Sequence, residues 1–487
     1  MSNPHRSTVW RAPHAVTVPA VPHRCPPGRS RAPPAARRYI GEVPHTDPLE
    51  PSTAYLAHLA DETDARMRRS TAPDSPFAGA PPELSDAVES AAEALAPELD
   101  HVVAALHAEP ETAYEEHRSV ATLVEVLARQ GIRAESGVHG VETAFRAEVR
   151  GREDGPTIAI LAEYDALPNL GHACGHNVIA AAGVGAFLAL ARTLETRPDA
   201  VAGRVVLLGT PAEEGHSGKE VLARGGAFDD VDAAIMVHPY GYDLADQVWL
   251  GRRLLRWTFS GVSAHASAQP FMGRNALDAA ALAYQGIGLL RQQLPPVDRI
   301  HAVVTDGGTR PSVIPDRAVV ELYARSKYPD TLRDLSRRLD DVARGAALMT
   351  GTSVEIEWDE HPPSLPVRTN EALTARWVAA QRRRGRQPLA GGVVPETLAA
   401  STDFGNVSYR VPGIHPLIAI APPDVALHTE DFALAAAGPA ARSGALDGAV
   451  GLALTALDYL CDAELRDAVA AEFAAQGGPL DVPHYFD

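Results

Sequence analysis

Residues 157–177 read TIAILAEYDALPNLGHACGHN, and this stretch decides the fold class. It opens with a short apolar run that suits one buried strand, and an apolar helix pattern follows over 178–194. Further apolar strands are expected at 204–208 and 233–237, with a helix at 218–224 between them. Strands that alternate with helices predict an α/β domain with a mostly parallel sheet. Ligands of such sheets bind beyond the carboxyl ends of the strands, so side chains there are the first candidates for chemistry.

The middle of the chain predicts a second, inserted domain at 250–360. The expected order is strand, helix, strand, strand, helix, strand, in elements at 254–260, 275–293, 299–305, 317–324, 331–349 and 353–358. This is the order of a ferredoxin-like α+β unit. The first domain is therefore expected to comprise 85–249 and 361–487, with its leading helices at 85–107 and 117–130.

The N-terminal segment differs from the rest in composition. Residues 1–48 hold ten of the 40 prolines and seven arginines but only two acids. Such a segment buries little apolar surface, so 1–50 is expected to be a disordered extension. It lacks the apolar region of a secretory signal, and its composition also suits a transit peptide or a start codon assigned too early. Residues 51–84 are expected to form a variable linker with one short helix at 53–69.

Composition and charge exclude several classes of protein. The 487 residues are 45% hydrophobic and 22% charged, which is typical of a globular chain and not of a collagen or a coiled coil. The formal net charge of −18 argues against nucleic acid as the main partner. The longest apolar run, 178–191, is shorter than the roughly 18 residues of a membrane helix, so a buried helix and no membrane partner are expected. The three cysteines, Cys25, Cys174 and Cys461, fit a cytoplasmic location better than a disulfide framework.

Two of the predicted strand ends carry groups that bind metals or move protons. Cys174 and His176 lie in a glycine-flanked loop before a helix, and both residue types bind zinc well. A buried cysteine beside a loop histidine is the alternative interpretation. Glu213 and Glu214 follow the next strand, where adjacent side chains on extended backbone point to opposite sides. One carboxylate could then bind metal while the other moves a proton, although an exposed acidic turn remains the alternative.

His238 follows the third strand, and His428 lies far downstream. A single histidine at a strand end is more often structural, but three successive strand ends would bring such groups to one edge of the sheet. The candidate metal ligands are Cys174, His176, Glu214, His238 and His428, enough for two ions that share a water. A redox protein built on Cys174 is less consistent with the sequence, because no C-x-x-C motif is present.

The chain resembles the aminoacylase and carboxypeptidase family of dinuclear metallopeptidases, in the amidohydrolase branch that includes aminobenzoyl-glutamate hydrolase and β-alanyl-lysine dipeptidase types. The resembling segments occur in the family's order, at 163–168, 172–177, 211–215, 401–408, 413–416 and 428–430. The resemblance implies a lid and dimerisation domain at 250–360 and a homodimer. It also implies two divalent metal ions per subunit, zinc or manganese with cobalt or nickel as alternatives, and places Cys174 where other branches have a bridging Asp.

The resemblance also implies roles for residues outside the ligand set. Glu213 would be the general base, and Asp165 would orient a metal ligand. His265 of the lid would reach a neighbouring active site and stabilise the oxyanion. Asn275 and Arg325 would hold the substrate carboxylate, although a helix cap or a surface salt bridge would also explain these two residues.

Three departures from the family pattern affect the expected substrate. Asn177 replaces a frequent Asp, His216 replaces a more usual Gly and could line the pocket or add a ligand, and Ser312 replaces a usual Asn. The expected reaction is hydrolysis of the amide of an N-acyl amino acid, an aminobenzoyl-glutamate-like amide or a small dipeptide. A β-alanyl or γ-aminobutyryl dipeptidase acting on Lys or Orn, a carbamate or xenobiotic amide hydrolase, and a non-catalytic small-molecule-binding protein remain alternatives.

Overall fold

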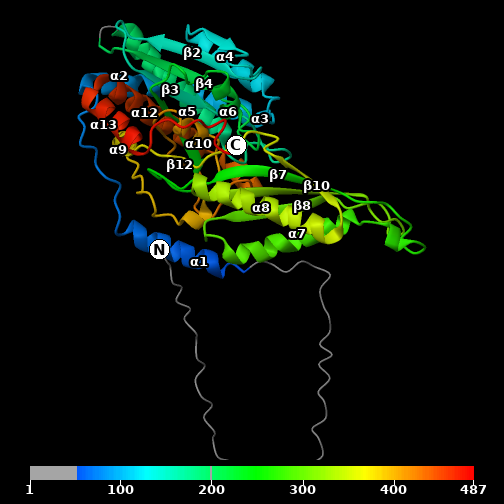
Figure 1. Ribbon diagram of the computed structural model, residues 1–487. Coiled ribbons are helices and arrows are strands. Elements are labelled where there is room, and N and C mark those ends of the chain that lie inside the picture. The colour runs from blue at the N-terminus through cyan, green and yellow to red at the C-terminus, as the bar shows by residue number, and fades with distance from the viewer. Residues whose placement is uncertain (1–51, 198–199) are drawn as a thin grey trace, which may run out of the picture. The chain divides into compact units, whose positions relative to one another are not determined.

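The predicted strand at 157–161 lies inside a six-stranded sheet with the order β1-β2-β4-β3-β5-β11 (Figure 1). The strands of this sheet are β1 (Ala134–Ser136), β2 (Phe145–Arg150), β3 (Thr157–Ala162), β4 (Arg204–Gly209), β5 (Ala233–Ile235) and β11 (Gly413–Ile414). Neighbours from β4 to β11 pair in parallel, whereas β1 and β2 add an antiparallel edge. The α/β class with a mostly parallel sheet is therefore confirmed.

The computed structural model describes residues 52–197 and 200–487. Residues 54–487 form one compact unit. The predicted extension, residues 1–50, lies outside the described residues. The domain bounds at 85–249, 250–360 and 361–487 stay predictions.

The helices outside the inserted region mostly pack on one another or on the first sheet. They are α1 (Ala54–Met67), α2 (Pro82–Glu93), α3 (Ala96–Ala108), α4 (His117–Arg129), α5 (His176–Thr196), α6 (Gly218–Arg224), α9 (Glu371–Arg383), α10 (Phe404–Ser408), α11 (Glu430–Ala435), α12 (Pro439–Cys461) and α13 (Ala463–Ala475). The helices α5 and α12 pack against each other in the main core. Both are long and apolar enough to cross a membrane, but nearly all of each is buried inside this unit. The apolar run at 178–191 is thus a buried helix.

Two sequence expectations about element bounds were wrong. The single helix expected at 85–107 is broken after Glu93, and a new helix starts at Ala96. Pro97 explains the break, because a proline inside a continuous helix lacks the required N–H and clashes with the preceding turn. The strand expected at 233–237 ends at Ile235, and His238 opens a separate strand.

That separate strand arises because the chain changes its pairing partner. The strand β6 (His238–Tyr240) pairs in parallel with β12 (Leu417–Ala419). The N–H of His238 donates to the carbonyl of Pro416, which fixes the start of the new pairing. The imidazole of His238 is therefore held by a two-stranded ribbon beside the main sheet.

The inserted region forms a second, antiparallel sheet with the order β10-β7-β9-β8. Its elements are β7 (Gly251–Ser260), α7 (Ala276–Leu290), β8 (Arg299–Asp306), β9 (Arg317–Ser326), α8 (Pro329–Thr350) and β10 (Ser353–Trp358). Alternate residues of β7 are buried, and these form a core with α7 and α8 on one face of the sheet (Figure 1). This is the predicted ferredoxin-like order. On the opposite face, β7 carries the half-buried residues Arg252, Leu254, Arg256 and Thr258.

Candidate metal centre

A left-handed glycine places the first two candidate ligands. Gly175 precedes α5 with φ of +82°, a conformation that glycine adopts readily. A Cβ atom there would lie 2.9 Å from the ring of Pro239, so the close approach to β6 also requires glycine. The turn leaves Cys174 and His176 on either side, both buried.

A turn with an uncommon backbone conformation precedes the two glutamates. Ala212 has φ of +60°, which is uncommon for a residue with a side chain. The buried Glu116 holds this turn, because its Oε1 accepts the N–H of Ala212 at 2.9 Å. Strain of this kind persists where the surroundings determine the backbone, as at functional sites. Glu213 and Glu214 follow directly.

The five predicted ligands come together. The Sγ of Cys174 lies 3.4 Å from Nε2 of His238. The Oε1 of Glu214 lies 3.2 Å from Nε2 of His428 and 4.0 Å from Nε2 of His176. Three overlapping sets have ligand atoms within 4.8 Å of one another: Cys174, His176 and His238; Cys174, Glu214 and His428; His176, Glu213 and Glu214.

The donor atoms in this cluster fit a divalent cation. The Nδ1–H of His238 donates to the carbonyl of Pro239 at 2.7 Å, which leaves Nε2 as the lone-pair nitrogen facing Cys174. The Nε2 of His176 is buried and has no hydrogen-bond partner among the described residues. Buried polar atoms are normally satisfied, and a bound metal would satisfy this one. Imidazole, thiolate and carboxylate together suit zinc, manganese, cobalt or nickel.

Protonation in the cluster follows from burial and neighbouring charge. Burial, and then the nearby His176, lower the pKa of His238 to about 3, so this ring is neutral at pH 7. Burial and then the charge of Glu214 raise the pKa of the Cys174 thiol well above its usual range. A cation beside that sulfur would offset both effects and favour the thiolate.

Glu213 has the environment of a proton-transfer group. Burial and then the charge of Glu214 raise the pKa of its carboxyl well above the usual range. Its Oε1 accepts the N–H of Asp403 at 3.4 Å. A carboxyl with a raised pKa can both accept and return a proton near neutral pH.

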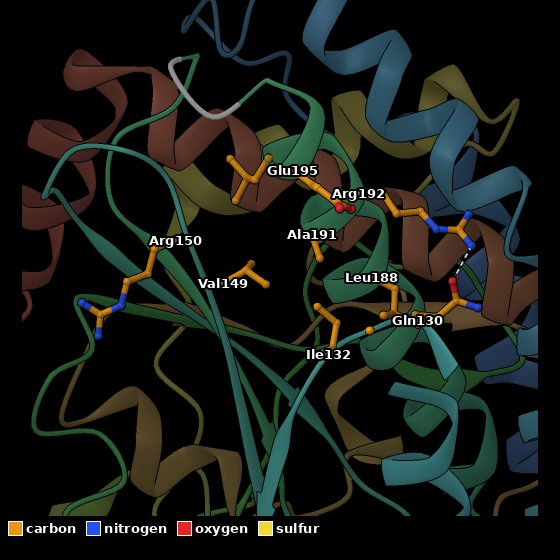
Figure 2. Close-up of a pocket in the computed structure, with 10 residues that line it drawn as sticks. Gln130, Ile132, Val149, Arg150, Leu188, Ala191, Arg192 and Glu195 are labelled. Carbon is orange, nitrogen blue, oxygen red and sulfur yellow. Dashed lines mark hydrogen bonds between the residues drawn. The ribbon is translucent and has the colours of Figure 1, made fainter. Parts of the chain in front are cut away.

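A small cavity of about 90 Å³ opens onto the cluster. Its lining includes four of the candidate ligands and Glu213. The other lining residues include Trp249, Arg252, Arg325, Ser401 and Thr402. A wider cavity of about 420 Å³ lies elsewhere, beside α5 and β2, and is lined by Gln130, Arg150 and Arg192 among others (Figure 2). None of the predicted site residues lines that cavity.

Two predicted residues, His265 and Asn275, neither line the cavity nor belong to the ligand cluster, and His216 lies next to the cavity-lining Gly215 without joining a ligand set. His265 is exposed, and its Nδ1 accepts the N–H groups of Ser267 and Ala268. Asn275 caps α7 by accepting the N–H of Leu277, which is the helix-cap alternative stated for it. The ring of His216 packs 4.3 Å from that of His361, and His216 belongs to none of the three ligand sets.

Sequence reasoning missed a buried ion-pair network beside the cluster. Lys219, at the start of α6, is fully buried and donates to Glu163 and to Asp403, the latter at 2.6 Å. The second oxygen of Glu163 lies 3.4 Å from Nε2 of His176. Glu163 and Asp403 both lie in the segments that carry the family resemblance, but neither was assigned a role. Nothing in the sequence indicated that Lys219 would be buried, because lysine is rarely fully buried.

Known proteins share this fold and sequence. Residues 159–443 match the model of Peptidase family M20/M25/M40. The chain is 39% identical over 377 residues to Xaa-Arg dipeptidase of Mus musculus, which covers 76% of the chain and 87% of the relative. It is 31% identical over 428 residues to a p-aminobenzoyl-glutamate hydrolase component of Escherichia coli (strain K12), covering 73% and 88%.

Solved structures agree on the fold. A putative aminohydrolase from methicillin-resistant Staphylococcus aureus matches with a TM-score of 0.64 and 21% identity over 77% of this chain and 100% of that one. A dinuclear metal binding peptidase of Bacillus subtilis, described as an M20 protein, matches with a TM-score of 0.57 and 23% identity, covering 75% and 99%. The fold and cluster define an α/β metallohydrolase. The chain belongs to Peptidase family M20/M25/M40, and it is a hydrolase of peptide or other amide bonds.

Proposed function

We propose that the chain is a two-metal amidohydrolase that releases an amino acid from an N-acyl amino acid, an aminobenzoyl-glutamate-like amide or a small dipeptide. The observation that carries this proposal is the set of overlapping ligand groups with Glu213 beside them. Cys174 belongs to two of these groups, so it would join two metal positions. The names of relatives that act on aminobenzoyl-glutamate and on Xaa-Arg dipeptides support a small amide substrate.

The five ligands would divide between two positions. Cys174, His176 and His238 would hold one divalent ion, and Cys174, Glu214 and His428 the other. Such ions, when bound, lower the pKa of a water and polarise a carbonyl. Zinc or manganese is proposed, and cobalt or nickel would also suit the donor set.

Glu213 would move the proton. Its carboxylate would accept a proton from the attacking water and then return it to the leaving amine nitrogen. Its burial, which raises its pKa, and its place beside the ligand sets support this role. Asp165 would hold His176 in place, and Arg325 would bind the carboxylate of the released amino acid.

A homodimer is proposed through the lid domain. Exposed apolar side chains occur on this domain, including Phe271, Met272, Tyr284, Leu289, Val303, Val304, Leu348 and Met349. His265 is exposed and does not line the cavity of its own chain, as expected of a residue that serves a neighbouring subunit. There it would donate a hydrogen bond to the developing oxyanion. A cytoplasmic location is part of the same proposal.

A second candidate is a dipeptidase for substrates with a basic C-terminal residue. The 39% identity to Xaa-Arg dipeptidase of Mus musculus supports this candidate. This dipeptidase would use the same ligand cluster and the same general base as the amidohydrolase proposed first. The two candidate functions differ only in the amino acid that is released.

A hydrolysis screen of the metal-loaded full-length chain tests the function. The mixture would contain N-acyl amino acids, aminobenzoyl-glutamate, β-alanyl dipeptides and Xaa-Arg dipeptides, with products identified by mass spectrometry. We expect cleavage of one amide class. A metal-loaded, folded chain that cleaves no amide would contradict the proposal and favour a non-catalytic binding protein.

A further inference from the structure

Two arginines lie side by side on neighbouring strands of the second sheet, beside the ligand cluster. Arg252 on β7 is the direct register partner of Arg325 on β9. Opposed residues of an antiparallel pair share one face, with Cβ atoms about 4.5–5.5 Å apart. Both side chains line the cavity that contains Cys174 and Glu214. The sheet thus presents two guanidinium groups to the candidate active site.

This pairing is unfavourable for the fold alone. Like charges directly opposite each other destabilise a sheet. Arg299 on β8 is also the register partner of Arg325, which extends the row to three arginines. Burial and then the charge of Arg252 lower the pKa of Arg325, which reflects the same repulsion.

No carboxylate among the described residues forms an ion pair with any of the three. Arg252 donates to the hydroxyl of Ser217 at 3.2 Å, and Arg325 donates to that of Ser401 at 3.0 Å. Arg299 donates to backbone carbonyls of Val297 and Thr397. Arg256, on the same strand and face as Arg252, contrasts with them because it pairs with Glu321 and Glu360. Among the described arginines of these strands, those without an ion pair therefore lie at the end of the sheet that borders the cavity.

The carboxylates that line the cavity form no ion pair with these arginines, although the charge of Glu213 raises the pKa of Arg325. Glu213 and Glu214 belong to the proposed centre, where one moves the proton and the other binds metal. Tyr323 lies against both cavity arginines, with guanidinium carbons 5.5 Å and 5.4 Å from its ring centre for Arg252 and Arg325. These cation–π contacts hold the two groups in place before any ligand binds.

We propose that Arg252 and Arg325 form a two-guanidinium subsite that selects amides whose released amino acid carries two carboxylates, of the aspartate or glutamate type. The inference rests on the proposed function and narrows its substrate class. Arg325 binds the main-chain carboxylate of the released amino acid, as already proposed. Arg252 supplies a second positive charge, which binds the side-chain carboxylate. Arginine suits this task because its planar fork binds a carboxylate through two hydrogen bonds. A basic residue in the same place would be repelled.

Matched substrates test this charge selection directly. The metal-loaded full-length chain would be assayed on amides of Glu, Gln and Arg, with the acyl group that the hydrolysis screen cleaves fastest. The Glu and Gln substrates have nearly the same shape and differ in charge. We expect kcat/KM for Glu to exceed that for Gln by at least about tenfold, mostly through KM, with Arg cleaved most slowly.

Variants separate a specific role from a structural one. Arg252→Gln should bring the Glu/Gln ratio close to one, and Arg252→Lys should retain part of it. The control Arg256→Gln should leave the ratio unchanged. The unfolding midpoint of Arg252→Gln should not fall, because the substitution removes a like-charge pair; a marked fall would identify Arg252 as structural and overturn the proposal.

The possible failures can be told apart. Equal rates for Glu and Gln, a preference for Arg, or a ratio that Arg252→Gln does not change would overturn the charge selection and leave the amidohydrolase standing. Absence of any amide cleavage would overturn the proposed function itself, and this inference with it.

Discussion

The Oδ1 atom of Asp165 lies 3.0 Å from the Nδ1 atom of His176. The other oxygen of the same carboxylate accepts the backbone N–H of Glu214 at 2.9 Å. One buried carboxylate therefore fixes two candidate ligands that come from different strand ends. It also directs Nε2 of His176 toward the cluster, because Nδ1 is already bound.

Replacement of Asp165 by Asn should weaken metal binding. Burial raises the pKa of Asp165, but the charge and hydrogen bond of His176 outweigh burial and lower it to about 2, so the group is charged at neutral pH. Loss of this charge should reduce metal affinity by roughly 10- to 100-fold, the usual effect of such an outer partner. Competition with a chelator would measure the change. Asp341→Asn, on an exposed part of α8, is the control, and equal affinities in both variants would contradict the assignment.

The Glu213→Gln variant should separate chemistry from metal binding. We expect it to retain its metal and to lose turnover by roughly 10²- to 10⁴-fold, since it removes the proton acceptor. Elemental analysis and a hydrolysis assay on the same sample would show both effects. Glu214→Gln is the matched comparison and should lose metal as well as activity. Substantial turnover in Glu213→Gln would show that another group moves the proton.

Lys219→Met should destabilise the fold strongly. The substitution leaves Glu163 and Asp403 buried without their cation, and removal of one member of a buried ion pair costs about 3–5 kcal/mol. Urea unfolding would measure this loss. The control Lys327→Met breaks a partly exposed pair with Glu396 and should change the free energy of unfolding by at most about 1 kcal/mol. Similar effects of the two substitutions would contradict a structural role for the buried network.

Glu116 should make stability depend on pH. Burial and then the charge of Asp165 raise the pKa of Glu116 from 4.5 to about 7. The folded chain then binds this proton more tightly than the unfolded chain does, so stability falls as pH rises from about 4.5 to 7. Glu116→Gln removes this pH dependence. The change that it causes in the free energy of unfolding should therefore be up to ~3 kcal/mol more stabilising at pH 8 than at pH 4. Urea unfolding at both pH values tests this, and a pH-independent effect would contradict it.

Much of the ligand cluster could be predicted because strand ends meet at one edge of a parallel sheet. That geometry brings together His176 and Glu214, and short-range sequence patterns mark both. His238 was placed correctly in the cluster, although it opens its own strand. The break at Ala94 and Leu95 was not predicted, because the apolar periodicity of the sequence continues through it.

Side-chain contacts that depend on strand register, or on segments far apart in the sequence, could not be predicted. Lys219 looks like an ordinary helix lysine until Asp403 is brought beside it in the fold. The pairing of Arg252 with Arg325 depends on the alignment of β7 with β9, which the two strand patterns do not specify. His265 lies away from the cavity of its own chain, so its predicted role depends on a second subunit, which a single chain does not contain.

Titration of metal into the chelator-treated protein tests the central claim most directly. Amide hydrolysis and bound zinc or manganese would be measured on the same samples at each step. We expect activity to be absent without metal, to return as metal is added, and to level off at two ions per chain. Full activity in the metal-free chain, or no tight binding of either metal, would contradict the account.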